Sequence, residues 1–181
     1  MNNKLQLVIP DVDHEEMYTK MMDLWEDLGE KIEPQLLSRY SSKTKENVSY
    51  AKWLEWCEDD RTTGSNLSTK IPCTLYFLIE DEKEIIGSIV INHGKTHRGH
   101  LHAGIVPWHR GNGYGTIMLE LVLEKCREMG FKNIEIVPYK ENIGAVKTIF
   151  KNGGVLLEEF CEEGVWSQRY EIQLGNLNIP K

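Results

Sequence analysis

Hydrophobic positions near the start of the chain change from the period of a strand to that of a helix. Residues 4–9 alternate apolar and polar side chains, which predicts a short strand. Apolar residues at helical spacing follow over residues 17–28, and Gly29 is a natural end for this helix. Asp13 and Glu16 have the spacing of a capping box at its start.

The next segment is expected to hold a second helix and a long loop. Thr44 is a candidate cap, and the apolar positions within residues 48–57 suit one helical face. Residues 58–70 are polar, which predicts a loop. Loops of this length often carry function, so we expect this one and residues 29–40 to border a substrate site.

The middle of the chain is rich in β-branched and aromatic residues. Residues 74–80 and 84–92 flank a turn at residues 81–83, which predicts a hairpin. A second turn at residues 94–99 leads into a strand over residues 100–106. On that strand three apolar residues alternate with two histidines and a glycine: Leu101, Ala103 and Ile105 against His100, His102 and Gly104. One face is therefore apolar and the other bears histidines.

The last third of the chain alternates helices and strands. Apolar positions within residues 117–129 close one helical face, and residues 133–138 follow as a strand. This strand–helix–strand run predicts a right-handed parallel unit. A further helix begins at Asn142, and residues 155–160 and 165–174 predict a closing hairpin. The hairpin offers an edge on which two copies can pair, so a homodimer is a candidate assembly.

Composition bounds the class of protein. The chain has 181 residues with 40% hydrophobic and 27% charged side chains, which predicts one globular domain over residues 1–181. A net charge of −7 argues against a nucleic-acid partner. No apolar stretch suits a signal core or a bilayer span, and the four cysteines form no C-x-x-C pair. We therefore expect a cytoplasmic protein with reduced thiols and no membrane partner.

A loop with three alternating glycines lies between the strand at residues 100–106 and the next helix. Its residues are Arg110, Gly111, Asn112, Gly113, Tyr114, Gly115 and Thr116. Glycines at this spacing let successive N–H groups turn toward one point, and a helix N-terminus adds unpaired N–H groups and its positive dipole end. The sequence predicts an anion site that favours phosphate; a tight turn without a ligand is the alternative.

Three phosphate-binding motifs can be compared with this loop. A P-loop needs Gly-Lys followed by Ser or Thr, and the loop has no lysine. A dinucleotide fingerprint needs a third glycine where Thr116 stands. The third pattern, Arg-x-x-Gly-x-Gly, is met by Arg110, Gly113 and Gly115. It is the pyrophosphate loop of acyl-CoA-dependent N-acyltransferases, and here the sequence resembles the GNAT superfamily.

The resemblance extends over residues 4–174. The element order is similar to that of the superfamily, and residues 141–145 and 151–155 resemble its second conserved block. Residues 29–34 resemble the sequence of a bacterial subgroup that is known mainly as predicted acetyltransferases. The resemblance implies an α/β (α+β) fold with a mixed, mostly antiparallel central sheet and helices on both faces. It also implies a V-shaped splay between two parallel strands that end near Val106 and Pro138.

The resemblance further implies acetyl-CoA as acyl donor and a way of binding it. Backbone groups of Ala103, Ile105 and Val106 would pair with the pantetheine arm like an added strand. The N–H groups of residues 110–116 would hold the pyrophosphate, with side-chain contacts from Arg110 or Thr116. Asn142 would contact the pantetheine or shape the acyl site, and a plain helix cap is its alternative.

Acylation of an amine requires a neutral nitrogen, so a general base with a pKa near the working pH is expected. His102 is the favoured base ahead of His100 and Glu135, and the backbone N–H of Val106 is the expected oxyanion donor. The superfamily often has a tyrosine acid at the position that Ile149 takes here. The clustered histidines lack the Cys or carboxylate of a usual metal site, so no metal is expected.

Two functions follow from these residues. The first is an N-acetyltransferase that moves an acetyl group from acetyl-CoA to a primary amine of a small molecule, peptide or protein by direct attack in a ternary complex. The alternative is a non-catalytic acyl-CoA-binding module, for which the missing tyrosine speaks. A nicotinamide enzyme is a third class, and it would bind NAD instead.

Overall fold

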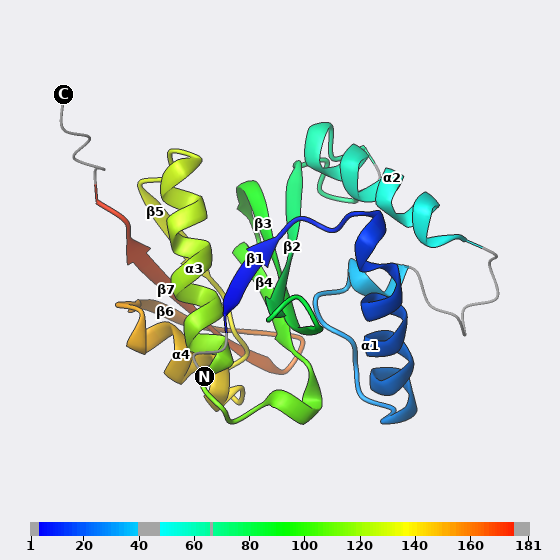
Figure 1. The fold of residues 1–181 in the computed structure, drawn as a ribbon. Coiled ribbons are helices and arrows are strands. Elements are labelled where there is room, and N and C mark those ends of the chain that lie inside the picture. Colours follow the sequence, from blue (N-terminus) through cyan, green and yellow to red (C-terminus); the bar gives the residue numbers. More distant parts are fainter. Residues whose placement is uncertain (1–3, 40–47, 66, 176–181) are drawn as a thin grey trace.

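A seven-stranded sheet forms the centre of the molecule (Figure 1). The computed structural model describes residues 4–39, 48–65 and 67–175. The strands lie in the order β1-β2-β3-β4-β5-β7-β6. Their bounds are β1 (Leu5–Val8), β2 (Cys73–Glu80), β3 (Glu84–Thr96), β4 (Gly99–Ile105), β5 (Asn133–Ile136), β6 (Val155–Glu162) and β7 (Val165–Gln173).

Helices cover both faces of this sheet. The α-helices are α1 (Glu15–Asp27), α2 (Tyr50–Thr62), α3 (Tyr114–Glu128) and α4 (Ile143–Lys151), and the short 3-10 helices are η1 (Val12–His14), η2 (Leu37–Arg39) and η3 (Pro107–His109). Helices α1 and α2 pack on one side, and α3 and α4 on the other (Figure 1). This arrangement confirms the predicted fold class. No helix in the described residues is both long and apolar enough to cross a membrane.

Neighbouring residues of the central strands serve opposite cores. Phe77 and Ile79 of β2 join the core under α1 and α2, whereas Leu78 between them joins the core under α3 and α4. Side chains alternate between the faces of a strand, and here both faces are buried. These strands therefore appear in the sequence as continuous apolar runs.

An aromatic cluster fixes the segment that follows α1. The ring of Tyr18 lies 4.7 Å from that of Trp53, and the Trp53 ring stacks on Phe77 at 6.1 Å. Two polar atoms of the cluster reach the next segment: the Tyr18 hydroxyl donates to Leu37 O at 2.5 Å, and Trp53 Nε1 donates to Leu36 O at 3.2 Å. The backbone around η2 is thereby held against the buried rings.

A short 3-10 helix, η1, precedes the first α-helix, which begins at Glu15. The capping box expected at Asp13 and Glu16 is wrong: the capping box belongs to η1 and begins at Asp11, whose side chain accepts from Asp13 N at 2.9 Å. His14 Nδ1 completes it by accepting from Asp11 N at 3.0 Å. Histidine takes the place of the usual Glu or Gln because its ring nitrogen is also an acceptor.

The second helix and the loop after it also differ from the prediction. Helix α2 is capped by Ser49, whose hydroxyl accepts from Lys52 N at 3.2 Å, while Thr44 lies outside the described residues. The loop expected over residues 58–70 is wrong in its first part, because α2 continues to Thr62. Charged side chains three residues apart pair along α2 and stabilise this polar helix. A polar composition alone does not distinguish such a helix from a loop.

The hairpin between β3 and β4 is tighter than expected. Strand β3 continues to Thr96 instead of ending at residue 92, and the Thr96 hydroxyl donates to Gly99 O at 2.6 Å. Strand β4 ends at Ile105, so Val106 follows it.

The expected parallel pairing of the two central strands is wrong. Among the described residues, β4 and β5 share one pairing, Gly99 with Ile136, and it is antiparallel. Gly99 has φ of +83°, and a Cβ there would lie 2.4 Å from Glu135 O. The contact is thus made by a turn residue whose backbone comes too close for any side chain. From His100 onward the edge of β4 that faces β5 carries no recorded strand pairing.

We predict that Trp53→Ala costs about 3–5 kcal/mol of unfolding free energy, because it removes a fully buried ring and leaves Leu36 O without its donor. Urea unfolding followed by circular dichroism measures this change. Phe150→Ala, at a site that is 74% exposed, is the control and should change stability far less. Equal midpoints for the two variants would contradict the role given to this cluster.

Candidate active site

The glycine loop connects β4 to α3 through the short helix η3. Gly111 has φ of +82° and Gly113 has φ of +85°, a region that other residues avoid. A Cβ at either position would meet no atom within 4 Å, so backbone conformation and not space requires these glycines. Open space around them leaves room for a ligand at this end of α3.

Backbone bonds narrow the amides that can meet an anion here. Arg110 N donates to Pro107 O at 3.3 Å, and Thr116 N donates to Gly113 O at 3.0 Å. Gly113 caps α3 without a side-chain hydrogen bond. Both ends of the predicted stretch therefore use their N–H groups internally, and the amides of residues 111–115 remain for a phosphate at the positive end of the helix dipole.

Gly115 has a different task from the other two glycines. A Cβ on it would lie 3.3 Å from the Thr148 hydroxyl oxygen of α4. Asn152 at the end of α4 donates through Nδ2 to Thr116 O at 3.3 Å. Gly115 thus permits the close approach of α4 to the first turn of α3.

The Arg110 side chain does not lie over the loop to which it belongs. Its Nε donates to Ile105 O at 3.1 Å, and its Nη1 pairs with Glu30 at 2.5 Å. The guanidinium also lies 5.9 Å from the centre of the Trp25 ring. The side chain expected to contact pyrophosphate is therefore bound to β4 and to the segment after α1.

The register of β3 and β4 decides which backbone groups of β4 are available. Val106 N donates to Ile86 O at 3.0 Å. In an antiparallel pair the bonding direction alternates along the strand, so the N–H and C=O of Ala103 and Ile105 point away from β3. The backbone groups of these two residues are directed to the open edge of β4, and their pairing with a donor stays a prediction. The Val106 N–H is engaged within the sheet, which argues against the oxyanion role expected of it.

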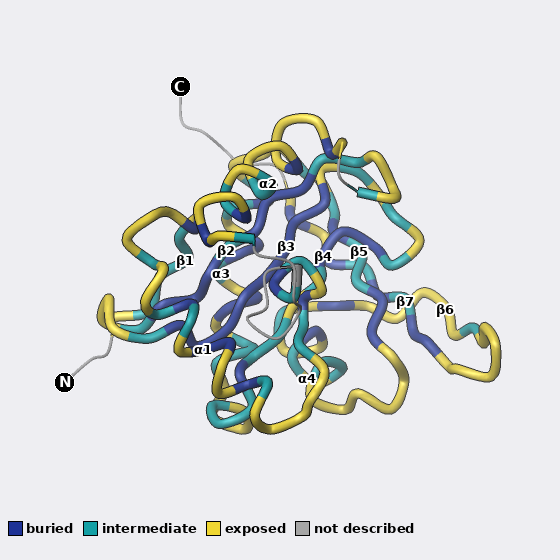
Figure 2. The backbone as a smooth tube through the Cα atoms, turned by 90° about the vertical axis from the view of Figure 1, so that its right-hand side faces the viewer, coloured by how far each residue is buried: buried dark blue, intermediate teal, exposed yellow. Residues whose placement is uncertain are grey.

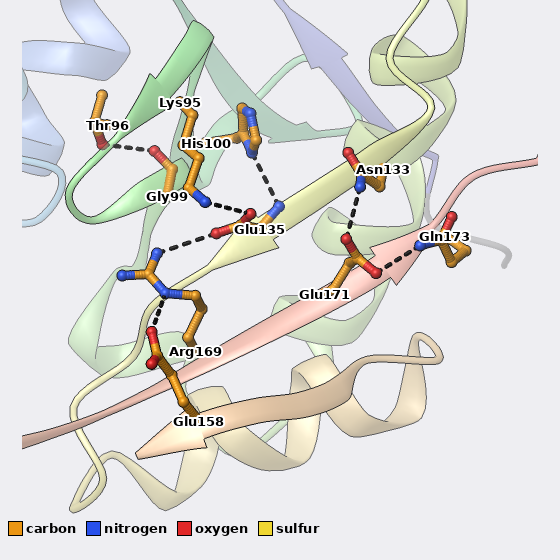
Figure 3. A network of polar contacts seen from close by, with 10 residues as sticks. All are labelled: Lys95, Thr96, Gly99, His100, Asn133, Glu135, Glu158, Arg169, Glu171 and Gln173. Atoms are coloured by element: carbon orange, nitrogen blue, oxygen red, sulfur yellow. Dashed lines mark hydrogen bonds and ion pairs between the residues drawn. The ribbon is translucent and has the colours of Figure 1, made fainter. Parts of the chain in front are cut away.

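His100 is a structural residue of the sheet. Its Nδ1 accepts from Glu135 N at 2.9 Å (Figure 3). Its ring meets the Phe131 ring edge-on at 5.5 Å. The imidazole thereby supplies the acceptor that a β4 carbonyl would supply in a regular ladder. Burial lowers the pKa of His100, which favours the neutral ring that this bond requires.

Glu135 is held as a carboxylate. It pairs with Lys95 at 2.7 Å and with Arg169 at 3.1 Å, and Arg169 also binds Glu158 at 2.8 Å (Figure 3). Burial by itself would raise the pKa of Glu135, but hydrogen bonds from both cations hold it below its usual value. A carboxylate stabilised in this way is a weak base, and these contacts link β3, β5, β6 and β7.

His102 keeps the features of a general base. Burial lowers its pKa, the Glu33 carboxylate opposes this, and Arg98 acts in the same direction as burial. The net shift is downward, so the imidazole is neutral at physiological pH and able to accept a proton.

The segment that carries Glu33 crosses β4 beside His102. A Cβ on Gly104 would lie 2.1 Å from Glu33 O, so only glycine lets this backbone cross β4. Glu33 also pairs with Lys31 at 2.5 Å. Residues 29–40 were expected to border a substrate site, but no pattern indicated that they touch β4 next to His102.

The remaining histidines of the predicted cluster have separate partners. His93 Nε2 is 2.8 Å from the Thr74 hydroxyl, and His97 Nε2 is 2.8 Å from Glu162. In the part of the chain that the structure describes, no group of three or more His, Cys, Asp or Glu side chains is placed to share a metal ion.

Asn142 and the candidate acids can also be placed. Asn142 Oδ1 accepts from Ala145 N at 3.0 Å, which is a helix cap, and this bond leaves the donor side of the amide for another contact. Ile149 is buried in the core at 2% exposure. The Tyr114 hydroxyl donates to Glu80 at 2.9 Å, and this bond raises the Tyr114 pKa. Tyr139 is 42% exposed and lies under the Arg98 guanidinium.

Sequence comparison identifies the family. The profile of the acetyltransferase (GNAT) family matches residues 23–153, which is more than half of the chain. This protein therefore belongs to the GNAT acetyltransferase family and is an acyl-transferring enzyme by that membership. No curated protein sequence gave a significant match.

Solved structures share the fold at low sequence identity. A putative acetyltransferase, yncA, from Salmonella typhimurium, solved with acetyl-CoA, is 13% identical with a TM-score of 0.61, covering 98% of each chain. A Vibrio cholerae spermidine N-acetyltransferase, solved with CoA and spermine, is 15% identical with a TM-score of 0.63, covering 94% of this chain and 95% of its own. The microcin C7 self-immunity acetyltransferase MccE, solved with acetyl-CoA and AMP, is 14% identical with a TM-score of 0.67, covering 95% and 93%.

We predict that Gly104→Ala destabilises the protein by about 1–3 kcal/mol, because the added methyl group meets the Glu33 carbonyl. Thermal unfolding measures the effect. The matched control is Gly144→Ala on α4, where the nearest atom is 3.6 Å away and a helix favours alanine. The control should be neutral or stabilising; if both variants behave alike, the contact does not hold this segment.

Proposed function

We propose that this protein is an N-acetyltransferase that uses acetyl-CoA as donor and transfers the acetyl group directly to a primary amine in a ternary complex. The observation that carries the proposal is the outward edge of β4 beside the glycine loop. Ala103 and Ile105 offer backbone donors and acceptors there, and the amides of residues 111–115 lie at the start of α3. An extended amide-bearing arm ending in a pyrophosphate matches both parts.

The described residues fit this donor. Gly111 and Gly113 leave open space for a pyrophosphate, and the edge of β4 can pair with the pantetheine amides. Asn142, at the start of α4, keeps the donor side of its amide for the same arm. When bound, acetyl-CoA supplies the acetyl group as a thioester.

The residues of this chain have distinct roles in the proposed reaction. His102 accepts the proton that the amine must lose, because burial keeps its imidazole neutral. We assign the oxyanion role first to the N–H of Ile105, because this group points away from β3 toward the open edge of β4. Val106 can take that role only by leaving Ile86 O, so we assign it second place.

A cationic amine is the acceptor class that the site supports. The Lys31 ammonium pairs with Glu33, so a primary ammonium group is accommodated beside the segment that crosses β4. The net charge of −7 is compatible with such a substrate. One structural neighbour is a spermidine N-acetyltransferase, which agrees with a small-molecule amine; a peptide or protein amine is the other form.

A non-catalytic acyl-CoA-binding module is the second candidate function. The observation that favours it is the absence of an acid where the family often has one: Ile149 is buried in the core, and the Tyr114 hydroxyl is bound to Glu80. A thiolate leaves without much help, since ordinary thiols have a pKa near 8.5. We therefore prefer the enzyme.

Thiol release and thermal stability separate the two functions. The protein is incubated with acetyl-CoA and a panel of polyamines, amino acids and lysine peptides, and free thiol is followed with a chromogenic reagent. A shift in melting temperature with CoA reports binding, because a ligand of the folded state stabilises it. Binding without turnover on any amine favours the binding module, and no shift at saturating CoA rejects both.

We predict that His102→Gln lowers kcat by about 10²–10⁴-fold and leaves the CoA-dependent melting shift unchanged, because it removes the base and not the donor site. In the parent enzyme the rate should fall as pH drops through the lowered pKa of His102, since protonation of the ring removes the base. This limb should vanish in the variant. His97→Gln, whose ring is 59% exposed and contacts Glu162, is the control and should keep the parent pH profile.

We also propose that two copies pair through β6. This strand is at the sheet edge and is exposed along most of its length (Figure 2). Val155 and Leu157 on it and Trp166 on β7 are at least half exposed. A free strand edge bordered by apolar side chains is a natural site for pairing with a second copy.

We expect a dimer in sedimentation experiments and a monomer for Leu157→Glu, because a charge at the apolar edge opposes pairing. Val12→Glu places the same charge at another exposed apolar residue, in η1, and should remain dimeric. A monomeric parent protein across the accessible concentration range would rule this assembly out.

A further inference from the structure

The Arg110 side chain joins the two halves of the site. Its backbone belongs to the glycine loop at the start of α3, where the pyrophosphate is proposed to bind. Its guanidinium reaches the other half, because Nη1 pairs with Glu30 at 2.5 Å over the buried Trp25 ring. One side chain thus links the donor loop to the segment after α1.

That segment is the one that lies beside the proposed base. Glu30 is three residues before Glu33, whose carbonyl crosses β4 at Gly104 and whose carboxylate acts on His102. The segment is therefore held on this side at two points, by Arg110 through Glu30 and by the close contact at Gly104. Moving Arg110 would release the first of them.

Arg110 also lies on the proposed path of the donor. Its Nε donates to Ile105 O at 3.1 Å, and this carbonyl belongs to the edge that the pantetheine arm would use. The guanidinium at this carbonyl occupies the position that the pantetheine arm would take when it pairs with β4 like an added strand. The donor and the Glu30 pair consequently compete for the position of one side chain.

We propose that Glu30 is a positioning residue that holds the Arg110 side chain against the segment after α1 and away from the proposed pyrophosphate site. Binding of acetyl-CoA is thereby coupled to the position of this segment. The inference rests on the proposed function, because the donor's path along β4 does. Binding of the donor displaces Arg110 from Ile105 O and weakens its hold on Glu30. By linkage, an acceptor that stabilises the Glu30 contact opposes donor binding by the same factor.

The test is Glu30→Gln, which keeps the size of the side chain and removes its charge. Both partners are about half exposed, and exposed ion pairs are worth about 0.2–1 kcal/mol, or about 1.4- to 5-fold in affinity. We expect the Kd for CoA, measured by calorimetry in low salt, to fall by about two- to fivefold. The gain should shrink in 0.5 M salt, because screening already weakens the pair in the parent protein. With an amine found in the panel, KM for the amine should rise.

Two further variants complete the experiment. Glu30→Asp retains the charge and should restore most of the parent Kd. Glu58→Gln breaks an exposed pair with Arg61 of similar exposure on α2 and should leave the Kd unchanged. An unchanged or higher Kd in Glu30→Gln overturns the coupling while the proposed function stands. A parent protein that binds no CoA overturns both.

Discussion

The pairing of β4 with β3 is the constraint on which the site depends. The bond from Val106 N to Ile86 O fixes the register, and the register fixes which amides of β4 point outward. A slip of the register by one residue would point the backbone groups of Ala103 and Ile105 toward β3. It would also move the histidine side chains to the opposite face of the sheet. On its other side β4 meets β5 at Gly99 alone among the described pairings. A strand anchored on one edge and open on the other can accept a peptide-like ligand without disturbing the core.

The segment between α1 and η2 is the second determinant. Buried rings hold its far end through Tyr18 and Trp53, and Gly104 lets its backbone cross β4. The result places Glu33 in electrostatic reach of His102. The position of this segment is thus set by a hydrophobic core at one end and by the missing side chain of Gly104 at the other.

Electrostatics explains why one base candidate remains out of three. The His100 ring accepts a hydrogen bond from Glu135 N, and the Glu135 carboxylate forms ion pairs with Lys95 and Arg169 (Figure 3). These groups have partners that satisfy them within the sheet. His102 is half-buried and forms no ion pair among those of the described residues, although Arg98 and burial both lower its pKa. It therefore stays the proposed base. Geometry separated these three residues, since histidine and glutamate can both serve in proton transfer.

The sequence by itself determined the elements, their order and the position of the anion loop, because periodicity and glycine spacing act over a few residues. It led to the right family and to Gly111 and Gly113 at the start of α3. It erred on the cap at Asp11, the length of α2 and the direction of the contact at Gly99, where local signals compete or a long-range contact decides. Only the tertiary structure decided that Val106 N–H is occupied and that Arg110 reaches Glu30. Residues 30 and 110 are far apart in the chain. No local pattern encodes their contact, because it forms only when the segments that follow α1 and precede α3 are brought together by the packing of helices on the sheet.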